Sequence, residues 1–333
     1  MIGVSENKTS VVERIYQISY PGGELRRITN DFSPYRNFSL SADGRSLFAV
    51  RHETITHVWT MPGNDANQIK QLTAGQDKYD GLLGLGWMPD GRIFYESKPG
   101  GRAETLVMNA DSGNVKQVLE NGYMTTLSPD GRFFVYQIHA PDEENGLFRH
   151  DLSDNTKKRL TTGFDAYATV TPDGKQVLFT RYDEPMGAYR VSIDGGEPTK
   201  IFSGAAYKPT ASPDGKQIAF YLSKGKQSGI AVMPFDGGEP TRIFEVGFPT
   251  TASGGLPQPT LQWTPDGRAI NYVVTRDGVS NIWRQPVDGG SPVQITNFTT
   301  NRIANFAFTP DGSQLALSRG TFNSDVVLIE NAK

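Results

Sequence analysis

The sequence is organised by one four-residue turn signal that recurs along its whole length. Its seven copies are Ser41-Ala42-Asp43-Gly44, Met88-Pro89-Asp90-Gly91, Ser128-Pro129-Asp130-Gly131, Thr171-Pro172-Asp173-Gly174, Ser212-Pro213-Asp214-Gly215, Thr264-Pro265-Asp266-Gly267 and Thr309-Pro310-Asp311-Gly312. Successive aspartates are 47, 40, 43, 41, 52 and 45 residues apart. A self-similar unit with a period of roughly 40 to 50 residues is typical of propeller blades. The seven copies therefore predict seven blades.

The residue types in this signal are those that a tight hairpin turn requires. Ser or Thr caps the turn, Pro presets φ, Asp accepts hydrogen bonds from nearby backbone, and Gly adopts a left-handed conformation. Seven aspartates also raise the alternative of acid catalysts or calcium ligands. We favour the turn, because each Asp is flanked by the turn's other requirements.

Apolar residues alternate on both sides of each turn. Four residues after the Asp stand Leu47, Phe94, Phe134, Val177, Ile218, Ile270 and Leu315, and two residues later Ala49, Glu96, Tyr136, Phe179, Phe220, Tyr272 and Leu317. Three residues before it stand Leu40, Trp87, Leu127, Val170, Ala211, Trp263 and Phe308. This period of two predicts paired strands with one side in a core, interrupted only by Glu96.

A second hairpin signal alternates with the first. It appears at Tyr20-Pro21-Gly22-Gly23, Asp111-Ser112-Gly113-Asn114, Asp194-Gly195-Gly196-Glu197, Asp236-Gly237-Gly238-Glu239 and Asp288-Gly289-Gly290-Ser291. One unit therefore holds four antiparallel strands, which we call a, b, c and d, with the first signal joining a to b and the second joining c to d. A four-stranded sheet repeated radially is a propeller blade.

The two ends of the chain complement each other. The chain opens with a c–d hairpin, residues 15–20 and 24–29, and closes with strands a, b and c from Ala304 to Glu330. The simplest closure takes the last blade's fourth strand from residues 24–29, which removes free sheet edges. One strand is left over, since residues 15–20 and 326–330 both have the pattern of strand c. Such a surplus is expected if an upstream blade or domain is missing.

The sequence thus predicts an all-β, seven-bladed β-propeller of four-stranded antiparallel blades, with its ring closed by an N-terminal strand. We expect one domain over residues 1–333, with residues 1–12 as a flexible lead-in, either complete or as part of a longer chain. The longest spacing between aspartates falls at Glu245 to Pro259, a segment rich in Gly, Pro, Ser and Thr. Long loops of this kind are often functional or mobile.

Composition excludes several classes of function. The net charge is −3 with both signs interspersed, so we expect no nucleic-acid partner. No apolar run is long enough to span a membrane, and the polar N-terminus shows no signal peptide. The absence of cysteine excludes disulfides, thiolate metal sites and a Cys nucleophile.

Catalytic and cofactor motifs are not found in the sequence. There is no Gly-x-Ser-x-Gly elbow for a serine hydrolase and no metal-binding spacing. The four histidines, His52, His57, His139 and His150, fall in loops or beside outer strands, where we expect ordinary surface residues. Gly81 to Gly86 is glycine-rich but does not match a dinucleotide-binding loop. We therefore expect no catalytic residues, no cofactor and no metal.

The repeated Ser/Thr-Pro-Asp-Gly-Arg/Lys turn followed by an apolar strand resembles the repeats of the bacterial TolB-like propellers, over nearly the whole chain. The ending, Leu315 to Gly320 and Asp325 to Ile329, is similar to that of propellers attached to bacterial membrane Ser/Thr protein kinases. This resemblance implies a sensor or scaffold module in an extracytoplasmic or periplasmic setting. Similar repeats precede the catalytic domain of prolyl-oligopeptidase-type enzymes, and some propellers are sugar-cleaving lyases with a tunnel site.

One face of the predicted ring carries most of the unassigned aromatic and charged residues. The a–b and c–d turns share one face, so the d–a and b–c loops form the other. The candidate residues nearest the central funnel are Arg36, Tyr123, Asp165, Tyr167, Tyr207, Lys208 and Arg302. Exposed aromatics beside Arg are typical of binding hot spots, whereas tyrosines at blade joints also pack in the core. Both interpretations stay open.

These residues favour a non-enzymatic, ligand- or protein-binding propeller. Arg36, Lys208 and Arg302 give the funnel a positive bias, partly offset by Asp165, which suits a protein or a small anionic ligand such as an acidic peptide or sugar acid. We expect a monomer. The alternative is the propeller portion of a prolyl-oligopeptidase-type hydrolase, or a tunnel-site lyase.

Overall fold

The computed structural model describes residues 2–5, 13–29, 35–63, 65–75, 79–98, 103–111, 113–138, 145–223, 228–246 and 260–330. His139 and most of the long segment ending at Pro259 lie outside these ranges, as do residues 6–12. Within the expected lead-in, Ile2–Ser5 form strand β1, because they pair with the strand that follows.

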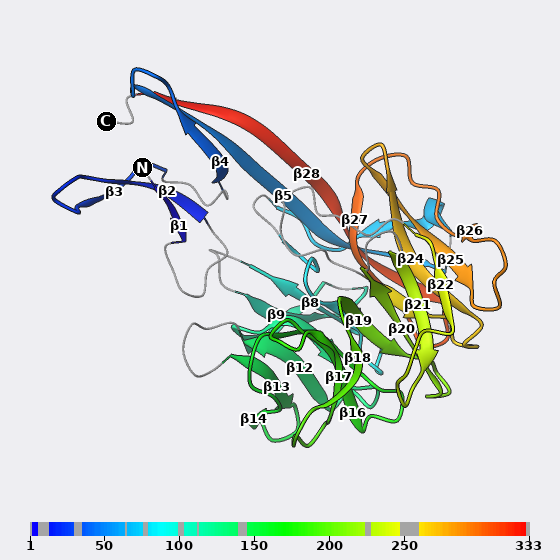
Figure 1. The fold of residues 1–333 in the computed structure, drawn as a ribbon. Coiled ribbons are helices and arrows are strands. Elements are labelled where there is room, and N and C mark those ends of the chain that lie inside the picture. The colour runs from blue at the N-terminus through cyan, green and yellow to red at the C-terminus, as the bar shows by residue number, and fades with distance from the viewer. Residues whose placement is uncertain are drawn as a thin grey trace.

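Five sheets are regular four-stranded antiparallel blades, each made from consecutive strands (Figure 1). Their strands are β7 (Leu85–Trp87), β8 (Ile93–Ser97), β9 (Glu104–Met108) and β10 (Val115–Glu120); β11 (Tyr123–Leu127), β12 (Phe133–Ile138), β13 (Gly146–Asp151) and β14 (Lys157–Arg159); β15 (Asp165–Val170), β16 (Gln176–Arg181), β17 (Gly187–Ser192) and β18 (Thr199–Ser203); β19 (Ala206–Ala211), β20 (Gln217–Leu222), β21 (Gly229–Pro234) and β22 (Arg242–Phe244); and β23 (Leu261–Trp263), β24 (Ala269–Arg276), β25 (Val279–Pro286) and β26 (Val293–Gln294). With the two sheets at the chain ends, hydrogen bonds group the strands into seven sheets. The all-β propeller built from seven copies of an antiparallel unit is confirmed.

Helical structure in the described ranges is limited to one 3-10 turn, Ala66–Gln68. Among the same residues, no helix is long and apolar enough to cross a membrane.

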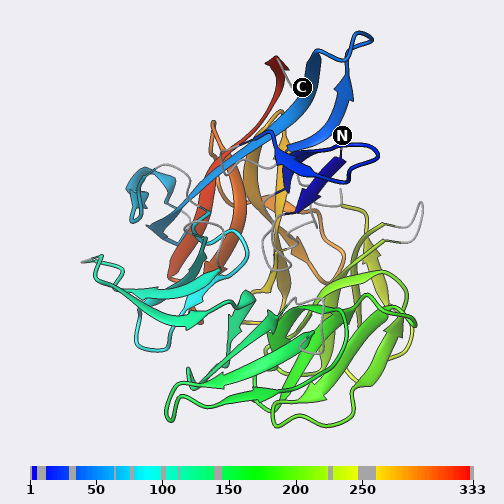
Figure 2. The same ribbon diagram turned by 90° about the vertical axis from the view of Figure 1, so that its left-hand side faces the viewer.

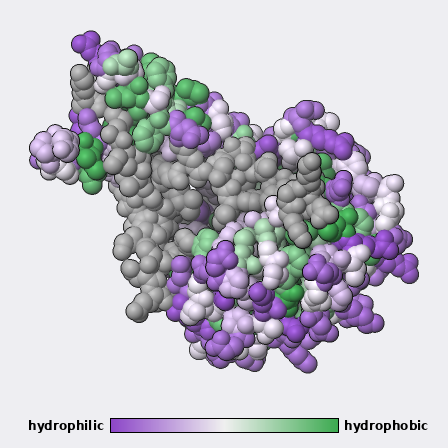
Figure 3. Space-filling view, viewed as in Figure 1, coloured by the Kyte–Doolittle hydropathy of each residue, from purple (hydrophilic) through white to green (hydrophobic). Residues whose placement is uncertain are grey.

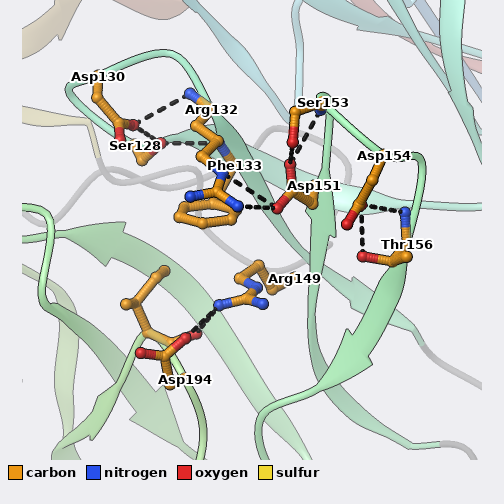
Figure 4. A network of polar contacts seen from close by, with 11 residues as sticks. Ser128, Asp130, Arg132, Phe133, Arg149, Asp151, Ser153, Asp154, Thr156 and Asp194 are labelled. Atoms are coloured by element: carbon orange, nitrogen blue, oxygen red, sulfur yellow. Dashed lines mark hydrogen bonds and ion pairs between the residues drawn. The ribbon is translucent and has the colours of Figure 1, made fainter.

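The a–b turns have the predicted chemistry, which Figure 4 shows for one copy. Ser128 Oγ donates to Asp130 Oδ1 at 2.5 Å, and the backbone N–H groups of Arg132 and Phe133 donate to Asp130 Oδ1 and Ser128 Oγ. Gly131 has φ +75°, in the left-handed region that glycine tolerates without strain. Because the carboxylate is used in this way, the interpretation of the aspartate as a turn residue is supported.

The core lies between neighbouring blades. Val135 of one blade packs with Val177 and Ala168 of the next, and Leu178 packs with Ile218 of the blade after that. All of these side chains are buried. Burying one such side chain contributes about 1.5–3 kcal/mol, so the contacts between blades stabilise the ring.

The sheet that joins the chain ends is built differently. Two 17-residue strands, β5 (Ser46–Pro62) and β28 (Gln314–Glu330), pair along their full length. The first half of β28 pairs with β27 (Arg302–Phe308), and the first half of β5 pairs with β4 (Tyr35–Leu40). Near its end, β5 also pairs with β6 (Lys70–Gln71).

The ring is closed by an N-terminal strand, but not by residues 24–29. β3 (Leu25–Arg27) pairs with β2 (Glu13–Ile18), and β2 with β1. The last blade instead consists of β27, the first half of β28, the second half of β5 and β6. The reason lies in residues 51–56, Arg-His-Glu-Thr-Ile-Thr, which contain no Gly, Pro, Asn or Asp. Without a turn residue, β5 runs on into the last blade.

Six of the seven units surround the central axis. Their inner strands meet in the series β27, β7, β11, β15, β19 and β23, and β27 also contacts the β23–β26 blade. Trp87 Nε1 donates to Ala307 O at 2.9 Å across the β7–β27 joint, and Gln262 Nε2 donates to Phe308 O at 3.1 Å on the other side of β27. We call these six units the ring.

The unit that contains Asp43 stands outside the ring. It consists of β4, residues 46–51 of β5 and residues 325–330 of β28, with β1–β3 packed against it through Ile15. Figures 1 and 2 show these strands extending away from the ring, with both chain termini there. We call this part the projection.

Candidate functional site

Strand a begins with a β-bulge in several units. A residue with positive φ lies within a register shift in four of them: Asn37 (+50°), Met124 (+55°), Tyr167 (+55°) and Lys208 (+51°). Such φ values are uncommon for residues other than glycine, and bulges re-aim side chains near functional sites. Three of these bulges belong to the ring, where they occupy the same end of their blades.

A polar side chain from one blade satisfies the bulge of the next. Thr180 Oγ1 donates to Ala206 O at 2.9 Å and accepts from Lys208 N at 3.2 Å. Between the β7–β10 and β11–β14 blades, Glu96 Oε1 accepts from Thr125 N. These bonds hold the bulged backbone in place, so the side chains that the bulges carry have fixed positions.

Glu96, which interrupts the apolar alternation in the sequence, is a functional candidate in the structure. The Asp90 turn closes with Met88 N donating to Arg92 O, one residue shorter than the Ser128 N to Phe133 O closure of its neighbour. Glu96 is therefore equivalent to Thr180, and the apolar alternation is unbroken there. The departure from the pattern was the signal that could have identified it.

Glu96 carries a carboxylate in a buried position. Its side chain is 1% exposed, and Oε2 has no hydrogen-bond partner among the described residues. Burial raises the pKa of Glu96, against the lowering effects of hydrogen bonding from Thr125 and the charge of Lys98. An unpaired buried carboxylate oxygen is costly, so this atom is available to a donor from outside the protein.

Two lysines, Lys98 and Lys208, interact electrostatically with the carboxyl group of Glu96. Burial lowers the pKa of Lys98 to about 8, and that of Lys208 to about 8, and Glu96 offsets part of both effects. Lys98 Nζ lies 4.7 Å from the centroid of the Tyr123 ring. Lys98 is on the β7–β10 blade and Lys208 on the β19–β22 blade, so the cluster draws on different sides of the ring. We call Glu96, Lys98, Tyr123 and Lys208 the axial cluster.

The tyrosines predicted at the funnel divide between the two interpretations. Tyr167 is 3% exposed and packs against Tyr182 and Tyr207, with 6.5 Å between centroids in each pair. Burial is the main cause that raises its pKa. Tyr123 and Tyr207 are half-buried. Tyr167 is thus a residue of the blade joint, while Tyr123 belongs to the axial cluster.

The remaining predicted residues lie elsewhere. Asp165 is fully buried in a two-bond ion pair with Arg181, at 2.7 and 2.8 Å, so its charge is compensated within its own blade. Arg302 is the first residue of β27, and its guanidinium carbon Cζ lies 5.7 Å from the centroid of the Phe322 ring. Arg36 is on β4 in the projection, opposite Val50, and is not brought to the ring.

Metal chemistry finds no support in the described ranges. There, no group of three or more His, Asp or Glu side chains could hold a metal ion. His52 Nδ1 lies 2.9 Å from Ser324 Oγ between β5 and β28, and His150 is buried in β13.

Comparison with solved structures identifies the fold. No protein-family model and no curated protein matches the sequence. TolB from Acinetobacter baumannii aligns with 84% of this chain and 61% of its own length, at 20% identity and a TM-score of 0.55. A putative TolB from Agrobacterium tumefaciens aligns over 80% and 99% of the two chains, at 17% identity and a TM-score of 0.61. A chain of Kuenenia stuttgartiensis hydrazine synthase aligns over 73% and 74%, at 16% identity and a TM-score of 0.52.

Proposed function

We propose that this protein is a non-enzymatic binding propeller, and that its axial cluster receives an anionic group of a protein or small-molecule ligand. The TolB-like propeller fold by itself decides neither for nor against catalysis, because the hydrazine synthase chain shares it. The module serves as the sensor or scaffold part of a larger bacterial protein, such as a membrane Ser/Thr kinase, in an extracytoplasmic or periplasmic setting.

One observation carries the proposal: two half-buried lysines, Lys98 and Lys208, interact electrostatically with the buried carboxyl group of Glu96, whose Oε2 has no hydrogen-bond partner among the described residues. At pH 7 lysines with a pKa of about 8 remain mostly protonated, so Lys98 and Lys208 attract an anion. Glu96 Oε2 accepts a hydrogen bond from a donor on the same ligand. A carboxylate that carries a nearby hydroxyl or amide N–H, as in a sugar acid or an acidic peptide, matches both features.

The chemistry of catalysis is less well matched. A general acid and base need to act on one reacting group from two positions. In the axial cluster, the carboxylate already accepts a backbone hydrogen bond and both lysines interact with it. These interactions favour fixed recognition of charge over proton transfer.

The test is calorimetric titration with two probes, hexaglutamate peptide and trigalacturonate. We expect Lys98→Met and Lys208→Met each to weaken binding by about tenfold or more, since a hydrogen bond to a charged group contributes about 1.5–3 kcal/mol. Lys175→Met is the matched control, because Lys175 is exposed beside an a–b turn on the opposite face. Equal affinity of Lys208→Met and Lys175→Met for both probes would contradict the proposal, and so would turnover of either probe.

A further inference from the structure

The two longest strands each contain segments of two different units. In β5, residues 46–51 follow the Asp43 turn as strand b of the projection, and residues 57–62 are strand c of the last blade. In β28, residues 314–319 are strand b of the last blade, and residues 325–330 are strand c of the projection. Strand b of the projection, in β5, therefore pairs with a strand c that lies in β28. Strand b of the last blade, in β28, pairs with a strand c that lies in β5.

In the regular blades, strands b and c of one unit pair with each other through a local hairpin. Gln137 pairs with Leu147 and Tyr221 with Ile230. Val50 occupies the position of Gln137, seven residues after the turn Asp, but its partner is Val326, 276 residues away in sequence. By the register of the other blades, Val50 would pair with Val58 in its own unit.

Strand b of the last blade, near the C-terminus, also pairs with a distant strand c. Ser318 pairs with Val58 in the structure, and by the regular register it would pair with Val326. The two units have exchanged equivalent strands. Because the exchanged partners are equivalent, each strand b has a strand c beside it in either arrangement, and exchange of identical elements has a low cost.

The projection presents the surface of a blade without its neighbour. Phe48, Val326 and Leu328 share one face of the projecting sheet and are 44%, 74% and 50% exposed. At the positions of Phe48 and Val326, the regular blades have Val135 and Leu147, both fully buried against the next blade. Figure 3 shows hydrophobic residues gathered over the projection. The opposite face is covered, with Leu47 and Ala49 packed on Ile15.

We propose that the projection is an opened form of the ring, and that β5 and β28 fold back into hairpins to insert the Asp43 unit as a seventh blade. The insertion point is the joint between β27 and β7, because the last blade and the Asp90 blade flank the Asp43 unit in the order of the repeats. There the apolar face of the projection meets a neighbouring blade. The contact between Trp87 and Ala307 opens to admit it.

Local contacts stabilise the opened form at its crossing point. Arg51 Nη2 lies 3.5 Å from Asp325 Oδ2, next to the contact between His52 and Ser324. At Gly320 a Cβ would lie 1.8 Å from Ile55 O, so this pairing requires glycine. Burial of the apolar face favours the seven-bladed form. These cross-strand contacts favour the opened form, and so does the lack of a turn residue in residues 51–56, where β5 has to turn to form its hairpin.

Engineered thiol pairs distinguish the two forms, and the chain has no native cysteine. Residues 50 and 58 lie on one continuous strand, about 26 Å apart at about 3.3 Å per residue, whereas a disulfide requires Cα atoms within about 7 Å. We expect Val50→Cys/Val58→Cys to oxidise in the folded protein, as the already paired Gln137→Cys/Leu147→Cys does. Val50→Cys/Thr60→Cys, which matches neither register, measures oxidation through unfolding.

Two further variants keep the test decisive if Val50→Cys/Val58→Cys does not fold. Ser318→Cys/Val326→Cys reports the same event from β28, and a Gly320→Ala background should increase the yield of both hairpin disulfides severalfold. Mass spectrometry gives the yield, and circular dichroism confirms folding. The proposal is overturned if neither hairpin pair oxidises faster than the Val50→Cys/Thr60→Cys control while Gln137→Cys/Leu147→Cys does.

Discussion

The regular blades and the projection contain the same repeat in two different surroundings. The turn at Asp43 has the same hydrogen bonds as the turn at Asp130, with Ser41 Oγ donating to Asp43 Oδ1 at 2.6 Å. Asn37 has the same left-handed bulge as Tyr167. The pairing and the packing differ, since Val50 pairs with the distant Val326 and Phe48 is exposed where Leu178 is buried. Local structure therefore follows the repeat sequence, whereas burial depends on which strand lies alongside.

The largest expected effect contrasts equivalent core positions of the two regions. Leu178→Ala should lower the free energy of unfolding by about 2–5 kcal/mol, because it leaves a cavity between two blades. Phe48→Ala, at the same position of the projection, should cost less than about 1 kcal/mol, because Phe48 is already 44% exposed. Urea unfolding followed by tryptophan fluorescence measures both. Equal losses would mean that the projecting face is covered in solution.

The second prediction concerns the pH dependence of stability. It arises from the bulge residue Lys208 of the ring, whose equivalent in the projection is the uncharged Asn37. The folded-state pKa of Lys208 is about 8, below its ordinary 10.5, because burial disfavours the charge. Between about pH 8 and 10.5 the unfolded chain therefore binds more protons, so the free energy of unfolding rises with pH. Lys98 contributes in the same direction.

Lys208→Met should reduce this rise, and the double variant with Lys98→Met should reduce it further. Urea unfolding at intervals from pH 7 to 10 gives the slope, with Lys175→Met as the control that keeps it. A slope that is unchanged in the double variant would show that the two ammonium groups are solvated, and that the axial cluster does not exist as described.

The third prediction tests whether β1–β3, which cover one face of the projection, contribute to the stability of the ring. Removal of residues 1–29 deletes β1–β3 and uncovers Leu47 and Ala49, but removes no strand of the last blade. The main melting transition should shift by no more than about 2 °C, equivalent to less than about 1 kcal/mol for a domain of this size. Limited proteolysis should become faster within residues 35–51. A sharp fall of the main transition would restore residues 24–29 as the closing strand.

The smallest expected effect is one that the two regions share. Asp43→Asn and Asp130→Asn should lower the melting temperature slightly and equally, because hydrogen bonds from Ser41 and Ser128 lower the pKa values of both carboxyl groups. A carboxyl group with a lowered folded-state pKa adds stability above its unfolded pKa, and this is lost as pH falls. Scanning calorimetry at pH 7 and pH 3 should therefore show smaller differences from wild type at pH 3. Unequal effects at pH 7 would mean that the turn depends on its neighbours.

Local features could be predicted from the sequence because short-range chemistry determines them. The turn at Ser128 to Gly131 and the strands that follow it depend on residues within a few positions of one another. Closure could not be predicted in this way. Residues 57–62 and 325–330 both have the apolar pattern of strand c, so either fits either unit. The choice depends on the absence of a turn residue between Arg51 and Thr56 and on contacts across the whole chain.

The candidate site was predictable only in part for the same reason. Tyr123 and Lys208 were found because the start of strand a recurs in each unit. Glu96 is an exception to the repeat pattern, but its role is not predictable from the sequence, since its register depends on the length of one turn. Lys98 follows a strand without any repeated signal, and only the fold brings its charge near that of Glu96. The sequence does not reveal a partner for Asp165, because Arg181 pairs with it from the adjacent strand of the folded blade.

Cross-linking of Val50 to Val326 is the most direct test of strand sharing between the chain ends. These residues are Cα partners in the structure, at opposite ends of the sequence. Val50→Cys/Val326→Cys should form a disulfide in the folded monomer under mild oxidation, with unchanged circular dichroism and an unchanged main melting transition. If both thiols stay free while Gln137→Cys/Leu147→Cys oxidises, β5 and β28 are not paired beyond the ring, and the two chain ends do not share strands.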